Sequence, residues 1–426
     1  MIKQKMTHKI GYKSILLLSL VLVLIAISIL ARLLRPVFTH TMINLNKSEL
    51  HNSRAHLRKT IAGDSHIRTP QRVKAVYMSQ CGAKSPQIRK HILDLISNTE
   101  LNAVVIDIKD YTGTVSFPTT LPYANAGKGC VVKDMKSLIK DFHKHGIYVI
   151  GRITVFQDPL YARHHPDLAV QSKSKNSPWA DWHGLHFIDV GARPFWKYIL
   201  AISREAHQKY MFDELNFDYI RFPSDGPMRD AVYMHSDYGS RADELENFFR
   251  YLSYNVKIPD KAGHLPVISA DLFGMTTTNY DDLTIGQVLE RALPYFDFIA
   301  PMVYPSHYPS WFLGLHNPNK HVYTVVNYSM KQAVKRTVAT STIIASPRYT
   351  IWQKHKSTSG KQLYKKPAFD KNKLRPWLQD FDYGGHYDAK EVRAQIKAVY
   401  DAGLNSWMLW DPANIYTKEA LLSSSE

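Results

Sequence analysis

The chain has 426 residues, of which 45% are hydrophobic and 21% charged, enough to bury the core of one large α/β domain. This composition excludes wholesale disorder and a protein with many membrane spans. The two cysteines, Cys81 and Cys130, exclude a disulfide-rich scaffold and a four-cysteine zinc module.

The net charge of +17 is unevenly distributed along the chain. Residues 1–72 contain twelve Lys and Arg and only two acidic residues, Glu49 and Asp64, which is a net charge of +10. The remaining 354 residues therefore carry only +7. Because most of the excess precedes the predicted folded domain, we expect no nucleic-acid partner.

The amino-terminal segment contains an uncharged apolar run of 18 residues, from Ser14 to Ala31. A helix of that length spans about 27 Å, close to the thickness of a hydrocarbon core. We therefore predict a basic cytoplasmic stub (1–13), a single-pass transmembrane signal anchor (14–35) and a flexible linker (36–71). A cleaved signal peptide is the alternative, although the sequence Leu-Ala-Arg-Leu-Leu-Arg-Pro after the run is a poor cleavage site.

Apolar runs rich in β-branched residues alternate with amphipathic stretches from Val73 onward. The predicted strands are Val73–Ser79, Ala103–Lys109, Ile147–Val155, Glu214–Phe222, Pro266–Phe273, Phe296–Tyr304, Arg375–Phe381 and Asn405–Trp410. The predicted helices are Pro86–Ser97, Met135–His145, Pro194–Tyr210, Arg241–Asn255, Val322–Val338 and Lys390–Ala402. Eight strands separated by helices predict an α/β fold, a (β/α)8 TIM barrel over residues 72–417, with a short tail at 418–426. Long loops are expected at Pro159–Arg193, Pro305–His321 and the Lys-rich Lys354–Lys373.

Acidic residues lie at the carboxyl ends of five predicted strands. A single one could cap a helix or pair with a base, but burying an ionised carboxylate is costly unless it is paired or hydrogen-bonded, so five together favour a functional role. Two carboxyl groups flanking a bond are what glycoside hydrolysis requires. Asp218 and Asp271 follow neighbouring strands, so they could approach the roughly 5–5.5 Å of a retaining pair. Arg221 could keep a neighbouring carboxylate ionised.

Other side chains at the same strand ends are expected to bind a saccharide. Tyr304, Trp377 and Trp410 offer flat faces for sugar rings. The full expected substrate-binding set is Asp107, Lys109, Arg152, Arg221, Tyr304, His307, Trp377, Gln379, Asp382, Trp410 and Asp411. No His-x-His pair stands on the first strand and no Gly-rich phosphate loop follows a strand, so we expect neither a catalytic metal nor a cofactor.

Several stretches resemble, in order, the blocks of a bacterial family of glycoside-hydrolase-like TIM-barrel domains that is distantly similar to the α-amylase clan. These are LNAVVIDIKDYTG (101–113), HGIYVIGRITVFQDP (145–159), FDELNFDYIRFPSDG (212–226), ISADLFGMTT (268–277), IAPMVYPSHYP (299–309), RPWLQDFD (375–382) and MLWDPANIYT (408–417). By strand order, the resemblance implies Asp218 as nucleophile, Asp271 as acid/base and Asp380 as transition-state stabiliser, with Asp382 as a rival for the third role. The arginine follows the strand-four Asp instead of preceding it, and the strand-five acid is Asp instead of Glu, which leaves the stereochemical outcome open.

The sequence therefore predicts a membrane-anchored glycosidase whose barrel faces the periplasm or the exterior, at the inner membrane of a bacterium. Its expected partner is an envelope or exported polysaccharide. The alternative is a catalytically silent barrel that binds polysaccharide in an export or wall-assembly complex. Cys81 and Cys130 are expected on neighbouring rim positions, either as a disulfide or as two free thiols.

Overall fold

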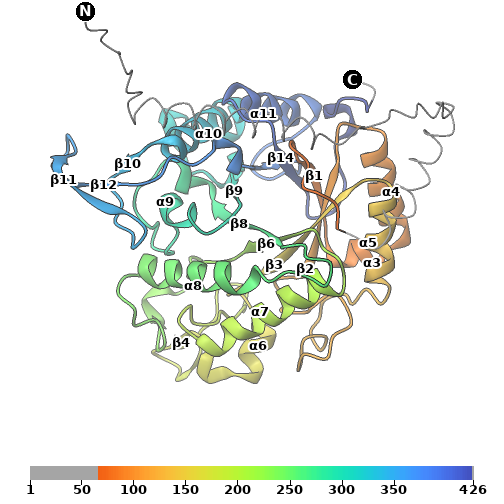
Figure 1. The fold of residues 1–426 in the computed structure, drawn as a ribbon, viewed down its shortest axis with the longest axis horizontal. Helices are drawn as coiled ribbons and strands as arrows, with labels where there is room; N and C mark the ends of the chain where they lie inside the picture. Colours follow the sequence, from red (N-terminus) through yellow and green to blue (C-terminus); the bar gives the residue numbers. More distant parts are fainter. Residues whose placement is uncertain (1–65, 425–426) are drawn as a thin grey trace, which may run out of the picture. The chain divides into compact units, whose positions relative to one another are not determined.

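The computed structural model describes residues 66–424, in which eight parallel strands close into a barrel in the order β1-β14-β13-β9-β8-β6-β3-β2. The barrel strands are β1 (Lys74–Met78), β2 (Ala103–Lys109), β3 (Tyr148–Thr154), β6 (Glu214–Asp218), β8 (Val267–Phe273), β9 (Phe298–Met302), β13 (Trp377–Gln379) and β14 (Trp407–Trp410). Figure 1 shows the helices arranged around these strands. The predicted TIM barrel is confirmed.

Helices connect the strands and cover the outside of the barrel. They are α3 (Gln80–Lys84), α4 (Pro86–Ser97), α5 (Met135–Lys144), α6 (Pro159–His164), α7 (Arg193–Gln208), α8 (Arg241–Val256), α9 (Leu289–Ala292), α10 (Val322–Val338) and α11 (Ala389–Asp401). Local signals set their starts. The Ser85 hydroxyl accepts a hydrogen bond from the Ile88 N–H ahead of Pro86, and Ser240 and Asp243 form a capping box on α8.

The alternation of side chains along each strand creates two separate apolar clusters. On β1, Ala75 and Tyr77 face the barrel interior, whereas Val76 and Met78 pack outward against the helices. The outer cluster is the larger one and includes the apolar faces of the surrounding helices. Packing between the strands and the surrounding helices therefore provides most of the apolar core, and the barrel interior can hold polar groups.

Polar side chains of β6 form a column along the barrel interior. Glu214 accepts hydrogen bonds from Arg375 Nη1 at 2.9 Å and from the Tyr148 hydroxyl at 3.0 Å. Asn216 lies two residues after Glu214 on the strand, and Asp218 lies two residues after Asn216. Because side chains alternate along a strand, all three point inward. The column leads from the amino-terminal end of the barrel, which we call the floor, to the carboxyl end.

The segment before β1 closes the floor. The backbone N–H of Ile67 donates to Asp213 Oδ1 at 2.7 Å, and the Thr69 hydroxyl lies 3.0 Å from that of Tyr148. Residues 66–71 were expected to belong to the flexible linker, and here the structure corrects the expectation: they pack on the barrel. The predicted stub and anchor, and the linker up to residue 65, lie outside the described residues. Across residues 66–424, no helix is both long and apolar enough to span a bilayer.

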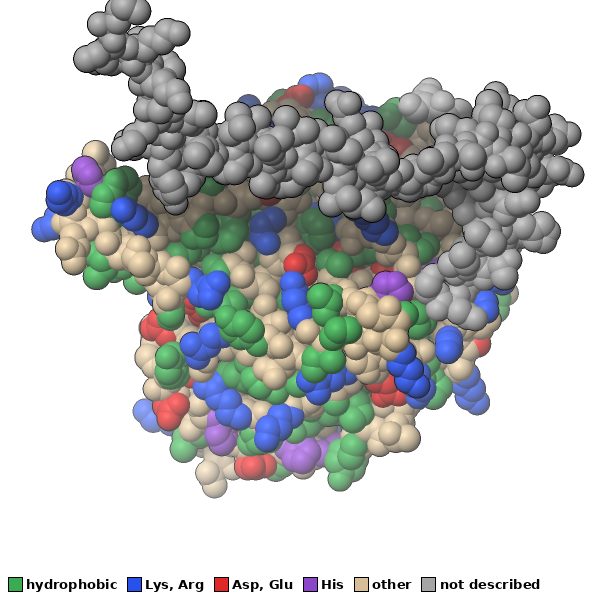
Figure 2. Space-filling model, in the orientation of Figure 1, with side chains coloured by type: hydrophobic (Ala, Val, Ile, Leu, Met, Phe, Trp, Pro, Cys, Tyr) green, Lys and Arg blue, Asp and Glu red, His purple; other side chains and the backbone are tan. Residues whose placement is uncertain are grey.

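Two of the predicted loops contain small sheets. The stretch 159–193 holds α6, β4 (Gln171–Ser172) and β5 (Ser177–Pro178), and β4 also pairs with β7 (Ala231–Val232). The Lys-rich stretch lies largely in a hairpin, β11 (Thr350–Lys356) and β12 (Gln362–Lys365), which β10 (Ser341–Thr342) joins. The hairpin projects from the barrel in Figure 1, and blue side chains mark it at the left of Figure 2. Elsewhere on that face, basic, acidic and apolar side chains are interspersed.

A disulfide joins Cys81 and Cys130, whose Cα atoms are 5.0 Å apart. Cys81 lies in α3, directly after β1, and Cys130 lies in the loop after β2. The bond therefore ties α3 to the loop after β2 at the carboxyl end of the barrel. Of the two states left open by the sequence, the structure has the disulfide.

Candidate active site

A cavity of about 590 Å³ opens at the carboxyl ends of the barrel strands. Its lining includes Asp218 from the end of β6 and Asp271 from β8. These two predicted catalytic carboxyl groups are thus brought into one cavity. A site of this size at this end of the barrel is where TIM-barrel enzymes bind their substrates.

Asp218 is held by Arg152 of β3. Arg152 Nη2 and Nε donate to Asp218 Oδ2 at 2.5 and 3.1 Å, and Nη1 donates to Asp107 Oδ1 at 2.7 Å. The hydroxyl of Tyr77 donates to the other oxygen of Asp107 at 2.5 Å. One guanidinium therefore joins two buried carboxyl groups and positions Asp218 through charge-assisted hydrogen bonds. Burial raises the pKa of Asp107 to about 6 against the opposing effect of Arg152.

Asp271 has a different environment from Asp218. Its Oδ1 accepts hydrogen bonds from Asn216 Nδ2 and Trp377 Nε1, both at 2.8 Å. Its Oδ2 is buried and has no hydrogen-bond partner among the described residues. Burial and the negative charge of Asp218 raise the pKa of Asp271 well above its usual value. This shift favours the protonated form of Asp271, with the proton best placed on the oxygen that accepts no bond.

The backbone turns sharply after Asp218. Tyr219 has φ of 50°, the left-handed region, which is uncommon for a residue with a bulky side chain. Its N–H donates to Asp218 Oδ1 at 2.6 Å. This turn ends the strand at Asp218 and keeps the carboxylate pointing across the cavity, and strained residues of this kind concentrate at functional sites.

Aromatic side chains form much of the remaining wall. Trp410 stacks on Tyr77 with ring centroids 3.9 Å apart, and Trp377 meets it edge-on at 5.5 Å. Tyr304 is buried beside them, and Tyr383 lines the same cavity with 62% of its surface exposed. The deep rings are thus fixed by packing, while Tyr383 offers a free face near the opening.

Arg221 and His307 also line the cavity, as predicted. Arg221 Nη1 donates to the carbonyl oxygen of Phe222 and to the hydroxyl of Ser224, both at 3.1 Å, so it holds the loop after β6. It therefore does not hold a catalytic carboxylate, and Arg152 has that role instead. His307 Nδ1 lies 2.8 Å from the Ser306 hydroxyl, and burial lowers the pKa of this histidine.

The structure does not place Asp380 in the cavity lining. Its Oδ1 and Oδ2 accept hydrogen bonds from the hydroxyl and the N–H of Thr417, at 2.7 and 3.1 Å. Burial raises its pKa to about 6. The expected third catalytic carboxyl group therefore fixes the chain after β14. Its rival Asp382 pairs with His386 at 2.8 Å and accepts the Tyr387 N–H, also outside the cavity lining.

Four further residues expected to bind substrate have structural contacts and do not line the cavity. Lys109 pairs with buried Asp158 at 2.9 Å, because the register of β2 against β3 shifts just before it. The side chain of Gln379 accepts from the Ser306 hydroxyl at 2.8 Å. Asp411 accepts the Ala413 N–H within its turn. The fourth is Asp107, described above with Arg152.

Sequence reasoning missed several members of the site. Asn216 could have been found from strand alternation, because it lies two residues before Asp218 on the same strand. Tyr77 could have been found in the same way, as an inward residue near the end of β1. Tyr219, Asp225 and Tyr383 lie in loops whose course no periodicity predicts, and only the structure places them in the lining.

Comparisons with known proteins agree with this architecture. Residues 75–416 match the model of a family described as "Putative glycosyl hydrolase domain". The glycoside hydrolase domain of PgaB (BpsB) from Bordetella bronchiseptica is similar over 80% of this chain and 95% of that chain, with 15% identity and a TM-score of 0.53. Alpha-L-fucosidase isoenzyme 2 from Paenibacillus thiaminolyticus is similar over 82% of this chain and 48% of that chain, with 11% identity and a TM-score of 0.50. At these identities the likeness shows the shared fold.

A hypothetical protein from Ruminiclostridium thermocellum ATCC 27405 is 31% identical over 46% of this chain and 96% of that chain, with a TM-score of 0.40. The search of curated proteins finds no match. Because the family model covers most of the sequence, the chain belongs to this glycosyl hydrolase family.

Proposed function

We propose that this member of the family is a glycosidase that hydrolyses an envelope or exported polysaccharide, using Asp271 as general acid and Asp218 as the ionised carboxylate. One observation carries the proposal. Two buried carboxyl groups line the same cavity in different surroundings: Arg152 binds Asp218, whereas burial and the charge of Asp218 raise the pKa of Asp271. This division between an acid and a base is what two-carboxylate glycoside hydrolysis requires.

Asp271 would protonate the glycosidic oxygen as the bond to the leaving sugar breaks. Its Oδ1 is already occupied by Asn216 and Trp377, so the proton is carried by Oδ2. After the leaving sugar departs, the same carboxylate can take a proton from the incoming water and return to its neutral state.

Asp218 would act at the anomeric carbon. Arg152 positions its Oδ2 and the Tyr219 N–H positions its Oδ1. Because Asp218 and Asp271 come from adjacent strands, we favour direct attack and a retaining outcome. Proton NMR of the first product released checks this: the anomer of the substrate is expected, and the opposite anomer would make Asp218 the base for a water molecule.

An extracytoplasmic location is part of the proposal. It is supported by the apolar run 14–31 of the sequence and by the Cys81–Cys130 disulfide, because disulfides persist mainly in oxidising compartments. Polysaccharides of the envelope or in export are the polymers that such a barrel would meet.

The test uses the full-length chain, purified in mild detergent and incubated with a panel of bacterial polysaccharides. We expect release of new reducing ends by the wild type, and a loss of at least about 100-fold in Asp218→Asn and in Asp271→Asn. Polymer binding measured on the same samples should survive both changes. Asp382→Asn is the matched control, because this carboxylate binds His386 and Tyr387 and does not line the cavity.

Two results would contradict the proposal. Cleavage that persists in Asp218→Asn would remove this residue from the mechanism. Binding without cleavage by the wild type, across the whole panel, would identify a catalytically silent polysaccharide-binding barrel.

A further inference from the structure

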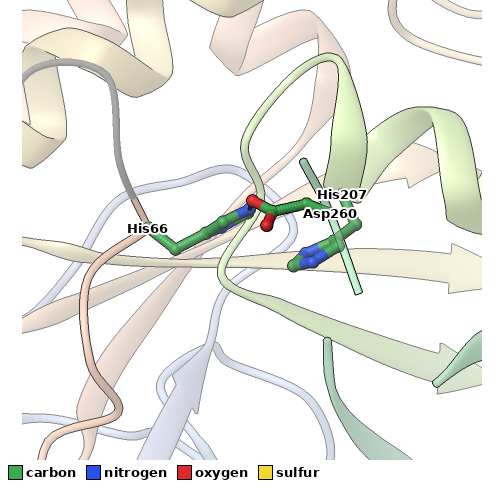
Figure 3. Close-up of side chains that lie close together, drawn as sticks. All are labelled: His66, His207 and Asp260. Atoms are coloured by element: carbon green, nitrogen blue, oxygen red, sulfur yellow. Dashed lines mark ion pairs between the residues drawn. The ribbon is translucent and has the colours of Figure 1, made fainter. Parts of the chain in front are cut away.

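A group of histidines and aspartates lies near the floor of the barrel, at the opposite end from the cavity. His66 comes from the segment before β1, His207 from the last turn of α7, and Asp260 from the loop between α8 and β8. One ligand atom from each of the three lies within 4.8 Å of the others. Figure 3 shows their side chains converging.

His66 is buried, and its ring makes only long contacts with carboxylates. Its side chain is 6% exposed, Nδ1 lies 3.5 Å from Asp213 Oδ1, and neither ring nitrogen makes a hydrogen bond of ordinary length among the described residues. Nε2 lies 3.5 Å from Asp260 Oδ2, longer than an ordinary N–H···O bond. Two ligand atoms held at about 2.0–2.2 Å by a tetrahedral zinc ion are about 3.3–3.6 Å apart. The separation therefore suits two ligands of one ion.

His207 has one ring nitrogen fixed and the other available. Nδ1 lies 3.1 Å from the carbonyl oxygen of Phe212, and Nε2 lies 3.2 Å from that of His264. A neutral imidazole has a single N–H, so it can donate to only one of these oxygens. With the proton on Nδ1, the lone pair of Nε2 cannot bond the carbonyl oxygen of His264 and is available to a cation.

Asp260 is oriented in the same manner. Its Oδ1 accepts the N–H groups of Ala262 and His264, both at 2.8 Å. Its Oδ2 is directed at the histidines: it lies 3.5 Å from His66 Nε2 and 3.2 Å from His264 Nδ1. The loop thus presents one carboxylate oxygen to the cluster and holds the other in place.

We propose that His66 Nε2, His207 Nε2 and Asp260 Oδ2 bind one Zn²⁺ ion, with His264 or a water molecule in the fourth position. Two imidazoles and a carboxylate are a donor set that zinc favours. The rings of His66 and His207 are stacked with centroids 4.1 Å apart, so ion binding requires His66 to turn its ring toward the shared site. This rotation gives up the 3.5 Å contact between His66 Nδ1 and Asp213 Oδ1, and it breaks no hydrogen bond of ordinary length.

The ion would serve the fold and not the cleavage reaction, because its ligands lie away from the carboxyl ends of the strands. It would join α7 and the loop before β8 to the segment through which the chain reaches the barrel. Asp213 contributes without being a ligand. It binds the Ile67 N–H at 2.7 Å and His143 Nε2 at 2.9 Å, so it fixes the backbone next to His66.

The experiment uses the full-length chain in detergent, stripped of metal by a chelator and dialysed against Zn²⁺ alone. We expect one bound zinc per chain by elemental analysis. At a zinc concentration about 100 times the Kd, the Tm should rise by about 3 °C. His66→Ala and Asp260→Asn should each weaken zinc binding at least tenfold and abolish the rise in Tm. His183→Ala, which changes an exposed histidine outside the cluster, should behave as the wild type.

Co²⁺ in place of Zn²⁺ gives a second readout that does not depend on stability. The visible absorption of a tetrahedral cobalt site should appear in the wild type and in His183→Ala, and be lost in Asp260→Asn, a substitution that keeps the shape of the side chain. Absence of saturable zinc binding by the wild type would overturn the proposal and leave His66 as a contact between Asp213 and Asp260. Equal binding by the wild type, His66→Ala and Asp260→Asn would also overturn it. If metal removal abolished polysaccharide cleavage without lowering the Tm, the structural role would be wrong.

Discussion

Two buried aspartates, Asp271 and Asp380, show that residue type and burial do not by themselves define a catalytic group. Burial raises the pKa of both carboxyl groups. Asp271 keeps one oxygen without a partner and lines the cavity, whereas Thr417 occupies both oxygens of Asp380. The sequence places both at strand ends and cannot tell them apart, because the difference depends on a partner that is 37 residues away from Asp380.

Asp380→Asn is expected to retain full activity and to change the pH dependence of stability. The pKa of Asp380 is about 6 in the folded chain and about 3.9 when unfolded. Between those values the folded state holds a proton that the unfolded state has lost, so this residue makes stability fall as the pH rises from 4 to 6. The loss amounts to at most about 3 kcal/mol. Chemical denaturation should show that the free energy of unfolding falls less between pH 4 and pH 7 in the variant than in the wild type. The amide of the variant can still bond Thr417.

The control for this comparison is Asp107, whose pKa is also about 6 and which stays in place in the variant. Because Asp107 is unchanged, part of the pH dependence of the free energy of unfolding should remain in Asp380→Asn. If Asp380→Asn reduced cleavage as strongly as Asp218→Asn does, Asp380 would be a catalytic residue, as strand order implied.

Arg152→Gln is expected to move the acidic limb of the pH–rate profile to higher pH and to lower kcat at least tenfold. The change removes the hydrogen bonds that position Asp218, and it leaves Asp107, whose pKa Arg152 lowers, without its ion pair. Initial rates measured from pH 4 to 8 check this. Arg221→Gln is the matched comparison, because Arg221 also lines the cavity but bonds Phe222 and Ser224; its acidic limb should stay in place.

At the scale of elements, the apolar pattern predicted the bounds of several buried strands and amphipathic helices. The predicted bounds of β2, α4 and α10 agree with the structure. The predicted strand 214–222 is too long, because the left-handed Tyr219 ends β6 at Asp218. The hairpin β11–β12 was predicted as a loop, because six of the seven residues of β11 are exposed and an exposed strand has no apolar alternation to reveal it. The sequence predicted those site residues that lie at the ends of strands. It did not predict the site residues that lie in loops.

Removal of the disulfide is expected to destabilise the barrel without altering the cavity chemistry. The bond closes a loop of 49 residues between α3 and the segment after β2. In the unfolded chain such a cross-link removes entropy, and its loss costs about 2–4 kcal/mol. Cys81→Ser/Cys130→Ser should show this decrease in urea denaturation. The wild type under reducing conditions should match the double variant, and a double variant as stable as the oxidised wild type would contradict the expectation.

At the scale of the whole molecule, most of the positive charge lies outside the barrel. Residues 1–72 carry +10 of the total of +17, and basic side chains on the visible face of the described part are scattered. The scattered charge on that face is typical of a solvated surface and marks no polyanion-binding patch there.

We predict that the full-length chain sediments with membranes and resists extraction at alkaline pH, because residues 14–31 are long enough to span a bilayer. Deletion of residues 1–35 should release the barrel with its Tm and activity unchanged. A protease added to intact spheroplasts should cleave the barrel, because the barrel is expected on the outer side of the membrane. Recovery of the undeleted chain in the soluble fraction, shortened at its amino terminus, would instead indicate a cleaved signal peptide.

The closed floor also bears on how a polymer could approach this enzyme. Ile67 and Thr69 seal the end of the barrel at which the chain arrives, and the cavity opens at the other end. The residues that lead into β1 and the cavity thus lie at opposite ends of the barrel. If the proposed substrate is a polymer, its strand can reach the cavity without passing the segment that leads into β1.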